Sequence, residues 1–467
     1  MKPTEKARER FAGKRVTVVG LAREGVSLVR FLAGVGARVT ANDRADRDAL
    51  ARTISSLDGL PVEFVLGGHP MELYLDSDCV FVSPGVPLQM EALARARGQG
   101  VPFSSETQLF FELCRGRLVG ITGSSGKTTT TTLVGEMIRT AGYRVHVGGN
   151  IGVPLLERLD EILPGDWVVL EMSSFQLEAL PYSPSVAAVL NITPNHLDRH
   201  GDMEGYIAAK SNILRHQKPG DRAILNADDA VAAALPTVEP PVWFSMARAV
   251  EGSYLEGNRI LLRREGTETT ICLAEEVRLR GRHNLYNVLA ACAIASATGV
   301  PVEAMGMAIA AFRGVPHRLE LVAEVEGVAY YNDSIATAPE RSIASLRSFD
   351  QPIVLIAGGR DKHLPMEEWG REIRERVKAL VLLGEASDLI ERAVLGAPGR
   401  PAPPIMRAVS MQEAVDLASE AAAPGDVVLL APGGISFDMF RDFEERGERF
   451  RECVRLLEQR SGGKERK

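Results

Sequence analysis

Residues 123–128 of this 467-residue chain read Gly-Ser-Ser-Gly-Lys-Thr, between an apolar stretch at 117–122 and a helical pattern at 129–140. In a strand–loop–helix segment of this kind, backbone N–H groups and the helix N-terminus bind phosphate oxygens. Lys127 would reach the β- and γ-phosphates of a nucleotide, and the Thr128 hydroxyl would bind Mg²⁺. The spacing therefore predicts a phosphate-binding loop.

The loop departs from the strict G-x-x-x-x-G-K-[ST] pattern, because five residues separate Gly120 from Gly126. The alternative is an ordinary strand-to-helix turn without a ligand. Gly-Lys-Thr at the turn favours an ATP-binding loop over this alternative. Which reaction follows is left open. The residues expected to contact ATP here are Gly123, Ser124, Ser125, Gly126, Lys127, Thr128 and Thr129.

Two more groups able to bind a metal ion follow apolar stretches. Glu171 ends residues 167–171 (Trp-Val-Val-Leu-Glu), and His196 follows the apolar stretch 186–192. Ligands of parallel sheets bind beyond the carboxyl ends of the strands, so both side chains and Thr128 form a candidate Mg²⁺ set. A single histidine is more often structural, but this position favours a ligand. Lys210 lies in a helical pattern, where a lysine is normally a solvated charge, and its spacing alone indicates nothing more.

The N-terminal region carries a weaker signal. Gly20 and Gly25 match the outer glycines of a dinucleotide fingerprint, but Ala22 replaces the middle glycine that lets a pyrophosphate approach. An ordinary turn and a ligand-binding loop both remain open. Asp43, at the end of the next expected strand, is either a partner for a ribose or uridine edge or a solvated surface group.

Three blocks of alternating strand and helix patterns must position these residues. The fold class expected is α/β with three domains, because strands alternate with helices and glycine follows the first strand. We expect a Rossmann-like N-terminal sheet over 1–105, a central P-loop ATPase-type mixed sheet over 106–315 and a Rossmann-like C-terminal sheet over 316–467. The polar stretch 245–280 is expected to form a small antiparallel subsheet. The other expected strands cover residues 15–20, 38–42, 79–82, 117–122, 167–171, 186–192, 222–226, 329–332, 353–357, 379–383 and 427–431.

Composition narrows the function classes. The formal net charge of -7 gives no electrostatic case for nucleic acid as a partner. The five cysteines lack Cys-x-x-Cys spacing, which argues against a zinc site or a disulfide framework and favours a reducing cytoplasm. The longest uncharged stretch, 284–302, contains two asparagines and a Gly-Val-Pro break, so it predicts a buried helix rather than a membrane span.

Together these motifs resemble the Mur ligase family over nearly the whole chain. Within the family, residues 171–178 (Glu-Met-Ser-Ser-Phe-Gln-Leu-Glu) and 195–199 (Asn-His-Leu-Asp-Arg) are similar to those of the member that adds glutamate. The features in the family's order are the loop 123–129, Gly-Gly-Asn at 148–150, Glu171, His196, Lys210, Asn-Ala-Asp-Asp at 226–229, His-Asn-x-x-Asn at 283–287 and His-Arg at 317–318.

The resemblance implies an ATP-dependent carboxylate–amine ligase. It would add D-glutamate to UDP-N-acetylmuramoyl-L-alanine through an acyl phosphate, in peptidoglycan synthesis and hence in cell-wall biogenesis and cell division. Two Mg²⁺ ions and a carbamylated Lys210, whose charge becomes negative, are implied as well. We expect a cytoplasmic monomer.

The same resemblance implies individual roles. The implied catalytic residues are Lys127, His196, Lys210 and Lys362, and the implied metal ligands are Thr128, Glu171, His196 and Lys210. The implied nucleotide contacts beyond the loop are Asn150, Asn287, Arg318 and Asp333. The implied substrate contacts are Arg23, Glu24, Asp43, Ser83, Gly85, Ser173, Thr337, Lys362, Ser436 and Phe443.

Two positions depart from the family pattern. Ile335 stands where Asp-Ser-Lys-Ala-Thr has its lysine, so a cation is missing near the amino-acid site and a ligase using another amino acid, such as L-glutamate, stays open. Arg23 and Glu24 are charged where neutral residues are common. A non-catalytic nucleotide-binding relative is the remaining alternative. It would have no need to keep Lys127, Glu171, His196, Lys210 and Lys362 together.

Overall fold

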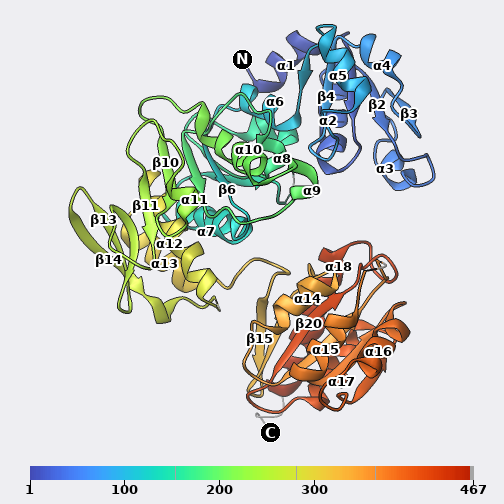
Figure 1. Cartoon of the computed structure of the whole chain (residues 1–467), viewed down its shortest axis with the longest axis vertical. Coiled ribbons are helices and arrows are strands. Elements are labelled where there is room, and N and C mark those ends of the chain that lie inside the picture. The colour runs from blue at the N-terminus through green and yellow to red at the C-terminus, as the bar shows by residue number, and fades with distance from the viewer. Residues whose placement is uncertain (153, 280, 363, 463–467) are drawn as a thin grey trace. The chain divides into compact units, whose positions relative to one another are not determined.

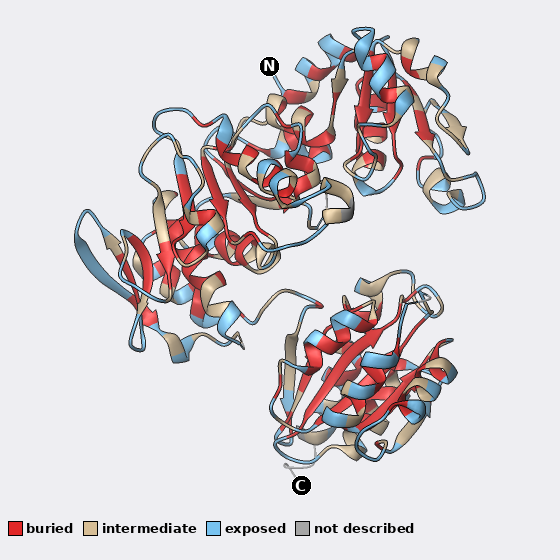
Figure 2. Ribbon diagram, in the orientation of Figure 1, coloured by how far each residue is buried: buried red, intermediate tan, exposed pale blue. Residues whose placement is uncertain are grey.

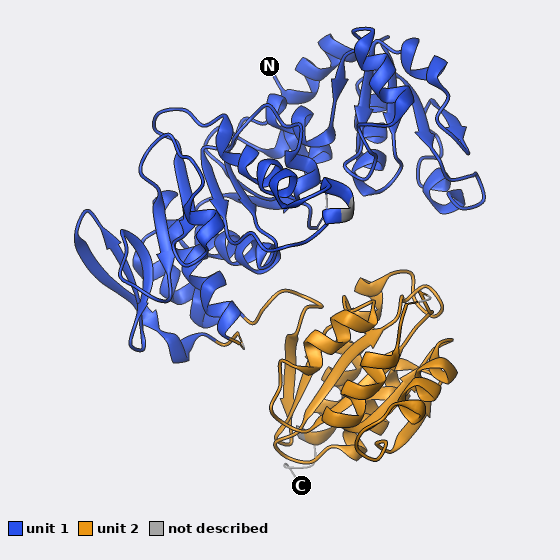
Figure 3. Cartoon of the chain, in the orientation of Figure 1, with its two compact units in different colours: residues 1–277, 282–312 blue, residues 278–281, 313–467 orange. Residues whose placement is uncertain are grey.

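The computed structural model describes residues 1–152, 154–279, 281–362 and 364–462. The chain divides into two compact units (Figure 3), each described by itself below. The first unit comprises Met1–Val277 and Arg282–Phe312, and the second comprises Arg278–Gly281 and Arg313–Lys467.

A five-stranded parallel sheet opens the first unit (Figure 1), in the order β3-β2-β1-β4-β5. Val16 in β1 pairs with Val39 in β2 on one side and with Cys79 in β4 on the other. The strands are β1 (Arg15–Val19), β2 (Arg38–Asp43), β3 (Val62–Leu66), β4 (Cys79–Val82) and β5 (Phe103–Ser104). The helices of this region are α1 (Pro3–Phe11), α2 (Arg23–Gly34), α3 (Ala51–Ser55), α4 (Met71–Leu75) and α5 (Glu91–Gly98).

A nine-stranded mixed sheet forms the rest of the first unit, in the order β14-β13-β12-β11-β10-β9-β6-β8-β7. Neighbouring strands are parallel from β7 to β12, and β12, β13 and β14 are antiparallel. The strands are β6 (Arg117–Thr122), β7 (Val145–Gly149), β8 (Trp167–Glu171), β9 (Val186–Val189), β10 (Arg222–Asn226), β11 (Val242–Ser245), β12 (Gly252–Glu256), β13 (Arg259–Arg264) and β14 (Thr267–Leu273).

Helices accompany both the parallel and the antiparallel part of this sheet. The predicted antiparallel subsheet is present, although residue 280 at its expected end lies outside the described residues, and the strand predicted over 186–192 ends at Val189. The helices are α6 (Glu106–Leu113), α7 (Lys127–Thr140), η1 (Leu156–Glu161), α8 (Ser174–Leu177), α9 (Leu197–His200), α10 (Met203–Arg215), α11 (Ala230–Ala233), η2 (Ala274–Glu276), α12 (Arg282–Ala297) and α13 (Val302–Ala311).

The second unit is a six-stranded sheet in the order β15-β16-β20-β17-β18-β19. The β15–β16 pair is antiparallel and the other neighbours are parallel. Its strands are β15 (Glu320–Val325), β16 (Val328–Asn332), β17 (Ile353–Gly358), β18 (Val377–Leu383), β19 (Ile405–Ala408) and β20 (Val427–Gly433). Its helices are α14 (Pro339–Leu346), α15 (Glu367–Arg376), α16 (Ser387–Gly396), α17 (Met411–Ala421) and α18 (Phe443–Gly462).

Each of the three sheets has at least one inner strand that is buried on both faces (Figure 2). Every residue of β4, β8, β17 and β20 is buried, as expected for parallel strands covered by helices. Helix α12, which covers residues 284–297 of the uncharged stretch 284–302, is buried over Asn287–Ala295. Among the residues that the structure describes, no helix is long and apolar enough to cross a membrane. The three α/β sheets confirm the predicted fold class; the central sheet is mixed, and the sheet of the second unit is parallel except for its edge strand β15.

Candidate active site

The phosphate loop leaves β6 and runs directly into α7. Gly126 adopts a φ of +80°, in the left-handed region, and a Cβ there would lie 2.2 Å from Asn287 Oδ1. Only glycine fits this close approach of α12 to the loop. Lys127 Nζ donates to the carbonyl oxygens of Gly123, at 2.7 Å, and Ser124, at 3.3 Å. The amine thus lies over the loop, where the oxygens of a bound phosphate would compete with these two carbonyls for its hydrogen bonds.

The segment after β9 fixes the other side of the loop. The backbone N–H of Ser125 donates to Asn191 Oδ1 at 2.9 Å, and the N–H of Thr193 donates to Ser124 Oγ at 2.9 Å. Ser124 Oγ also lies 3.0 Å from the Tyr206 hydroxyl of α10. These bonds fix the loop at the carboxyl ends of the neighbouring parallel strands β6 and β9, which is the edge where ligands of parallel sheets bind.

Glu171 is the acidic group nearest to the start of α7. It ends β8, is buried, and accepts hydrogen bonds from Thr128 Oγ1 at 2.7 Å and Asn150 Nδ2 at 3.0 Å. A hydroxyl and a carboxylate held together beside a phosphate loop are oxygen ligands of the type that Mg²⁺ prefers. The donor set therefore fits one divalent cation between α7 and β8.

Lys210 is not a solvated charge. Its side chain on α10 is 1% exposed, and Nζ donates to Gly123 O at 2.9 Å and to Thr122 Oγ1 at 3.4 Å. Burial and, to a smaller extent, the nearby positive charge of Lys127 lower the pKa of this amine to about 7, although the charge of Glu171 opposes both. A large fraction of Lys210 is consequently neutral at physiological pH.

His196 lies on the opposite rim of the loop, immediately before α9. Its backbone φ is +54°, and its ring packs edge-on against Phe175 with 5.1 Å between centroids. His200 stacks on the same Phe175 ring at 5.2 Å. His196 itself is exposed. In the described part of the chain, no group of three or more His, Cys, Asp or Glu side chains could by itself hold a metal ion.

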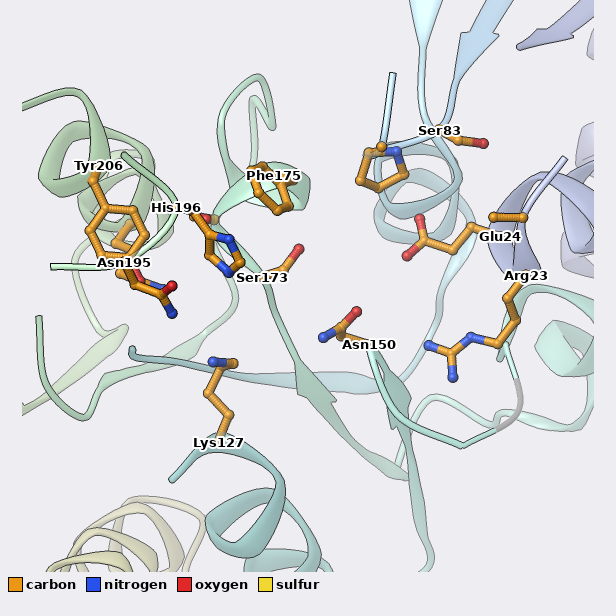
Figure 4. Close-up of a pocket in the computed structure, with 15 residues that line it drawn as sticks. Arg23, Glu24, Ser83, Lys127, Asn150, Ser173, Phe175, Asn195, His196 and Tyr206 are labelled. Carbon is orange, nitrogen blue, oxygen red and sulfur yellow. The ribbon is translucent and has the colours of Figure 1, made fainter. Parts of the chain in front are cut away.

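A cleft of about 360 Å³ connects the phosphate loop with the N-terminal sheet. Figure 4 shows Lys127 reaching toward Asn195 and His196, while Arg23 and Glu24 extend toward Asn150 from the other side. The predicted residues that line it are Arg23, Glu24, Ser83, Gly85, Lys127, Asn150, Ser173, His196 and Lys210.

Two predicted substrate residues of the N-terminal sheet serve the local backbone. Asp43 Oδ2 accepts from Leu21 N at 2.8 Å and Oδ1 accepts from Ala45 N at 2.9 Å, so Asp43 is a turn-forming group and lies outside the cleft lining. Ser83 Oγ donates to Gly20 O at 2.8 Å. Both residues therefore stabilise the loop that follows β1. Any contact of Asp43 or Ser83 with a substrate would come in addition to this structural role.

Half-buried Glu24 and buried Glu106 form an acidic pair that the sequence did not reveal. Gln176 Nε2 donates to Glu24 Oε1 at 2.7 Å, whereas Glu24 Oε2 has no hydrogen-bond partner among the described residues. Burial raises the pKa of Glu24 to about 7, opposed by Arg23 and Gln176. Burial and the charge of Glu24 together raise the pKa of Glu106 to about 8, opposed by the charge of Arg23.

In the second unit, Lys362 Nζ donates to Thr337 Oγ1 at 3.3 Å, so two predicted amino-acid contacts meet. Ser436 is buried, and the Phe443 carbonyl accepts from Ser334 Oγ at 2.8 Å. These residues come from the loops after β16, β17 and β20, at the carboxyl ends of neighbouring parallel strands.

The two predicted nucleotide contacts of this unit differ in their surroundings. Asp333 is buried and accepts from Leu319 N at 3.0 Å and from the Ser345 hydroxyl. Burial raises its pKa, opposed by Ser345 and by the charges of Arg318 and Arg341. Arg318 lies in the turn before β15, where its N–H donates to Val315 O at 3.1 Å.

Arg446 binds the two loops that carry Thr337 and Ser436, and nothing in its spacing indicated this. It is 2% exposed. Its guanidinium donates to Ser334 Oγ at 3.0 Å, to Ser334 O at 2.9 Å and to Gly434 O at 3.0 Å. Burial lowers the pKa of Arg446 to about 10. One arginine of α18 therefore joins the loops after β16 and β20.

Three profiles of Mur ligase domains match three consecutive parts of the chain. The profiles that match are the Mur ligase MurD-like N-terminal domain over residues 14–105, the Mur ligase middle domain over 121–295 and the Mur ligase glutamate ligase domain over 317–434.

Full-length relatives are similar throughout. The chain is 44% identical over 449 residues to the UDP-N-acetylmuramoylalanine--D-glutamate ligase of Symbiobacterium thermophilum, covering 95% of this chain and 98% of the relative. The ligase of the same name from Pelotomaculum thermopropionicum is 43% identical over 451 residues, with 96% and 98% covered.

Solved structures agree on the fold. UDP-N-acetylmuramate-alanine ligase from Thermotoga maritima matches with a TM-score of 0.59 at 20% identity, covering 95% of this chain and 100% of that one. MurF from Acinetobacter baumannii matches with a TM-score of 0.56 at 17% identity, covering 96% and 92%. At these identities the similarity concerns the fold alone.

Proposed function

This chain belongs to the Mur ligase family, and we propose that it joins D-glutamate to UDP-N-acetylmuramoyl-L-alanine at the expense of ATP. The relatives named for this reaction match over nearly their whole length. The observation that carries the proposal is the single cleft in which Lys127 of the phosphate loop faces the same space as Arg23 and Glu24 of the N-terminal sheet.

The proposed reaction has two steps. An oxygen of the alanine carboxylate attacks the γ-phosphorus of ATP, so an acyl phosphate forms and ADP leaves. The amine of glutamate then attacks the acyl carbon, an amide forms, and phosphate leaves with the amine proton passing to solvent or a base. The protein contributes positioning and electrostatic stabilisation rather than a covalent intermediate of its own.

The residues of the phosphate loop have the first roles in this scheme. Lys127 exchanges the Gly123 carbonyl for phosphate oxygens, and the loop N–H groups donate hydrogen bonds to the other phosphate oxygens. Thr128 and Glu171 would hold Mg²⁺, which would neutralise charge on the phosphates and orient them. His196, across the cleft, is the proposed ligand toward a second ion.

Lys210 is suited to carbamylation. A neutral amine attacks CO₂, a C–N bond forms, and one proton is released, which leaves a carbamate in place of a cation. A pKa of about 7 supplies the neutral amine at physiological pH, whereas an ordinary lysine does not. The carbamate would then face Lys127, a cation, instead of opposing it.

The remaining assignments follow the family pattern. Asn150, Asn287, Arg318 and Asp333 are the proposed nucleotide contacts, and Thr337, Lys362, Ser436 and Phe443 the proposed amino-acid contacts. Three domains over 1–105, 106–315 and 316–467 are proposed, each overlapping one family profile. A cytoplasmic location is proposed, since all five cysteines are free thiols. A monomeric state is proposed as well.

The test is phosphate release by the purified protein with ATP, Mg²⁺ and UDP-N-acetylmuramoyl-L-alanine. D-glutamate and L-glutamate are added in separate reactions. Release that depends on D-glutamate supports the proposal. Phosphate release with L-glutamate alone favours the second candidate function, a ligase that uses another amino acid. This candidate remains open because Ile335 replaces the lysine of the family pattern. Absence of release with either would support the non-catalytic alternative.

A further inference from the structure

The loop after β16 lacks the cation that the family pattern leads one to expect. It reads Asp333-Ser334-Ile335-Ala336-Thr337, so an aliphatic side chain stands at the lysine position. Lys362 is then the one cation among the proposed amino-acid contacts. A substrate such as glutamate, with two carboxylates, would have one of them without a positive partner.

Arg341 reaches the same loop from another element. It lies in the first turn of α14, and its Nη1 donates to the Ile335 carbonyl oxygen at 3.4 Å. Lys362, in the segment after β17, donates to Thr337 Oγ1 at 3.3 Å. Two cations from different elements thus contact residues 335 and 337 of one short loop.

The charges of the two side chains act on each other. Burial lowers the pKa of Lys362, and the positive charge of Arg341 lowers it further. Within the described ranges, neither Arg341 nor Lys362 forms an ion pair with a carboxylate side chain. The charge of Arg341 also acts on the Asp333 carboxyl, but no ion pair within 4.0 Å joins these two side chains. Neighbouring like charges repel each other, and a bound anion would relieve this repulsion.

We propose that Arg341 replaces the cation missing at Ile335 and binds one carboxylate of the incoming dicarboxylic amino acid, while Lys362 binds the other. This rests on the proposed ligase function and makes Arg341 a specificity-determining residue of that site. A guanidinium suits the task, because its planar N–H groups can bind both oxygens of a carboxylate. The alternative is a solvated arginine whose only role is to hold the Ile335 carbonyl.

Steady-state kinetics of Arg341→Ala separates the two. We expect the KM for glutamate to rise about tenfold or more, from the loss of a charge-assisted contact. The KM values for ATP and for the UDP-linked substrate should stay close to those of the wild type. Arg341→Lys, which keeps the charge, should recover part of the loss. Arg392→Ala, an exposed arginine of α16, is the matched control and should leave all three values unchanged.

Relocation of the charge is the sharper test. Ile335→Lys in the Arg341→Ala background should bring the glutamate KM back toward the wild-type value, and thermal unfolding should show that both variants fold. An unchanged glutamate KM in Arg341→Ala, an equal rise for all three substrates, or no recovery in the double variant would each overturn the proposal. If the wild type releases no phosphate, both the proposed ligase function and the role of Arg341 are overturned. If the wild type is active and the variants behave as just described, only the role of Arg341 is overturned, so the two failures are distinguishable.

Discussion

Thr128 Oγ1 and Glu171 Oε2 lie 2.7 Å apart, so the second residue of α7 and the last residue of β8 form a hydrogen bond beside the phosphate loop. Glu171 is buried, and the donors that hold its carboxylate are Thr128 and Asn150. A divalent cation placed here would take both oxygens as ligands in place of the hydrogen bond between them. The pair therefore gives the most direct test of the proposed Mg²⁺ site.

Thr128→Val and Glu171→Gln should each lower the rate of phosphate release by about 100-fold or more, because one stabilising contact to the transferred phosphate is lost. Glu171→Gln should also need more Mg²⁺ for half-maximal rate, since a neutral amide binds the ion weakly. Titration of the rate with Mg²⁺ measures both effects. Thr132→Val is the control, because that hydroxyl donates to Thr128 O at 2.9 Å within α7. A wild-type Mg²⁺ dependence in Glu171→Gln would exclude this site.

Lys210 should carry CO₂. With ¹³C-labelled bicarbonate, we expect one carbamate signal in the ¹³C spectrum, absent in Lys210→Met. Since the neutral amine reacts, the carbamate should form from about pH 7 upward and disappear as pH falls below the pKa of about 7. Lys218→Met, an exposed lysine of the same unit, should retain the signal. A spectrum without the signal at alkaline pH would contradict carbamylation.

The acidic pair of half-buried Glu24 and buried Glu106 should make the stability of the first unit depend on pH. Both pKa values are raised, to about 7 and about 8, so between about pH 4.5 and 8 the folded state binds more protons than the unfolded state. The free energy of unfolding should consequently fall as pH rises through this window.

Glu106→Gln should flatten that dependence, because one of the two groups no longer titrates. Urea unfolding at several pH values measures the slope. Glu91→Gln, at an exposed position of α5, should keep the wild-type slope. An equal slope in Glu106→Gln and the wild type would show that the pair does not control the pH dependence.

Arg446→Met should destabilise the second unit by about 3 kcal/mol, the order expected when hydrogen bonds to a buried charged group are lost and their acceptors remain unpaired. Denaturant unfolding of the full chain measures the loss. Arg449→Met removes an exposed arginine from the same helix and should cost less than about 1 kcal/mol. Similar losses for the two variants would mean that Arg446 does not anchor the loops at 334 and 434.

The sequence by itself determined the inner strands and the phosphate loop. Strands such as β8 and β17 are continuous apolar runs, because parallel strands are buried on both faces, and Gly126-Lys127 starts a helix through local backbone geometry. The strands that the sequence analysis missed include β3, β7, β15 and β19, each at the edge of its sheet. An edge strand is paired on one side only and is partly exposed, so its apolar pattern is weaker.

The environment of the charged groups was decided by the tertiary structure alone. The Lys210 amine reaches the Gly123 carbonyl from 87 residues away, and Gln176 reaches Glu24 across 152 residues. Arg446 and Ser334 are 112 residues apart. Periodicity reports which face of an element is apolar, but burial, the pKa shifts it causes and the partner of a charge depend on which distant elements pack together.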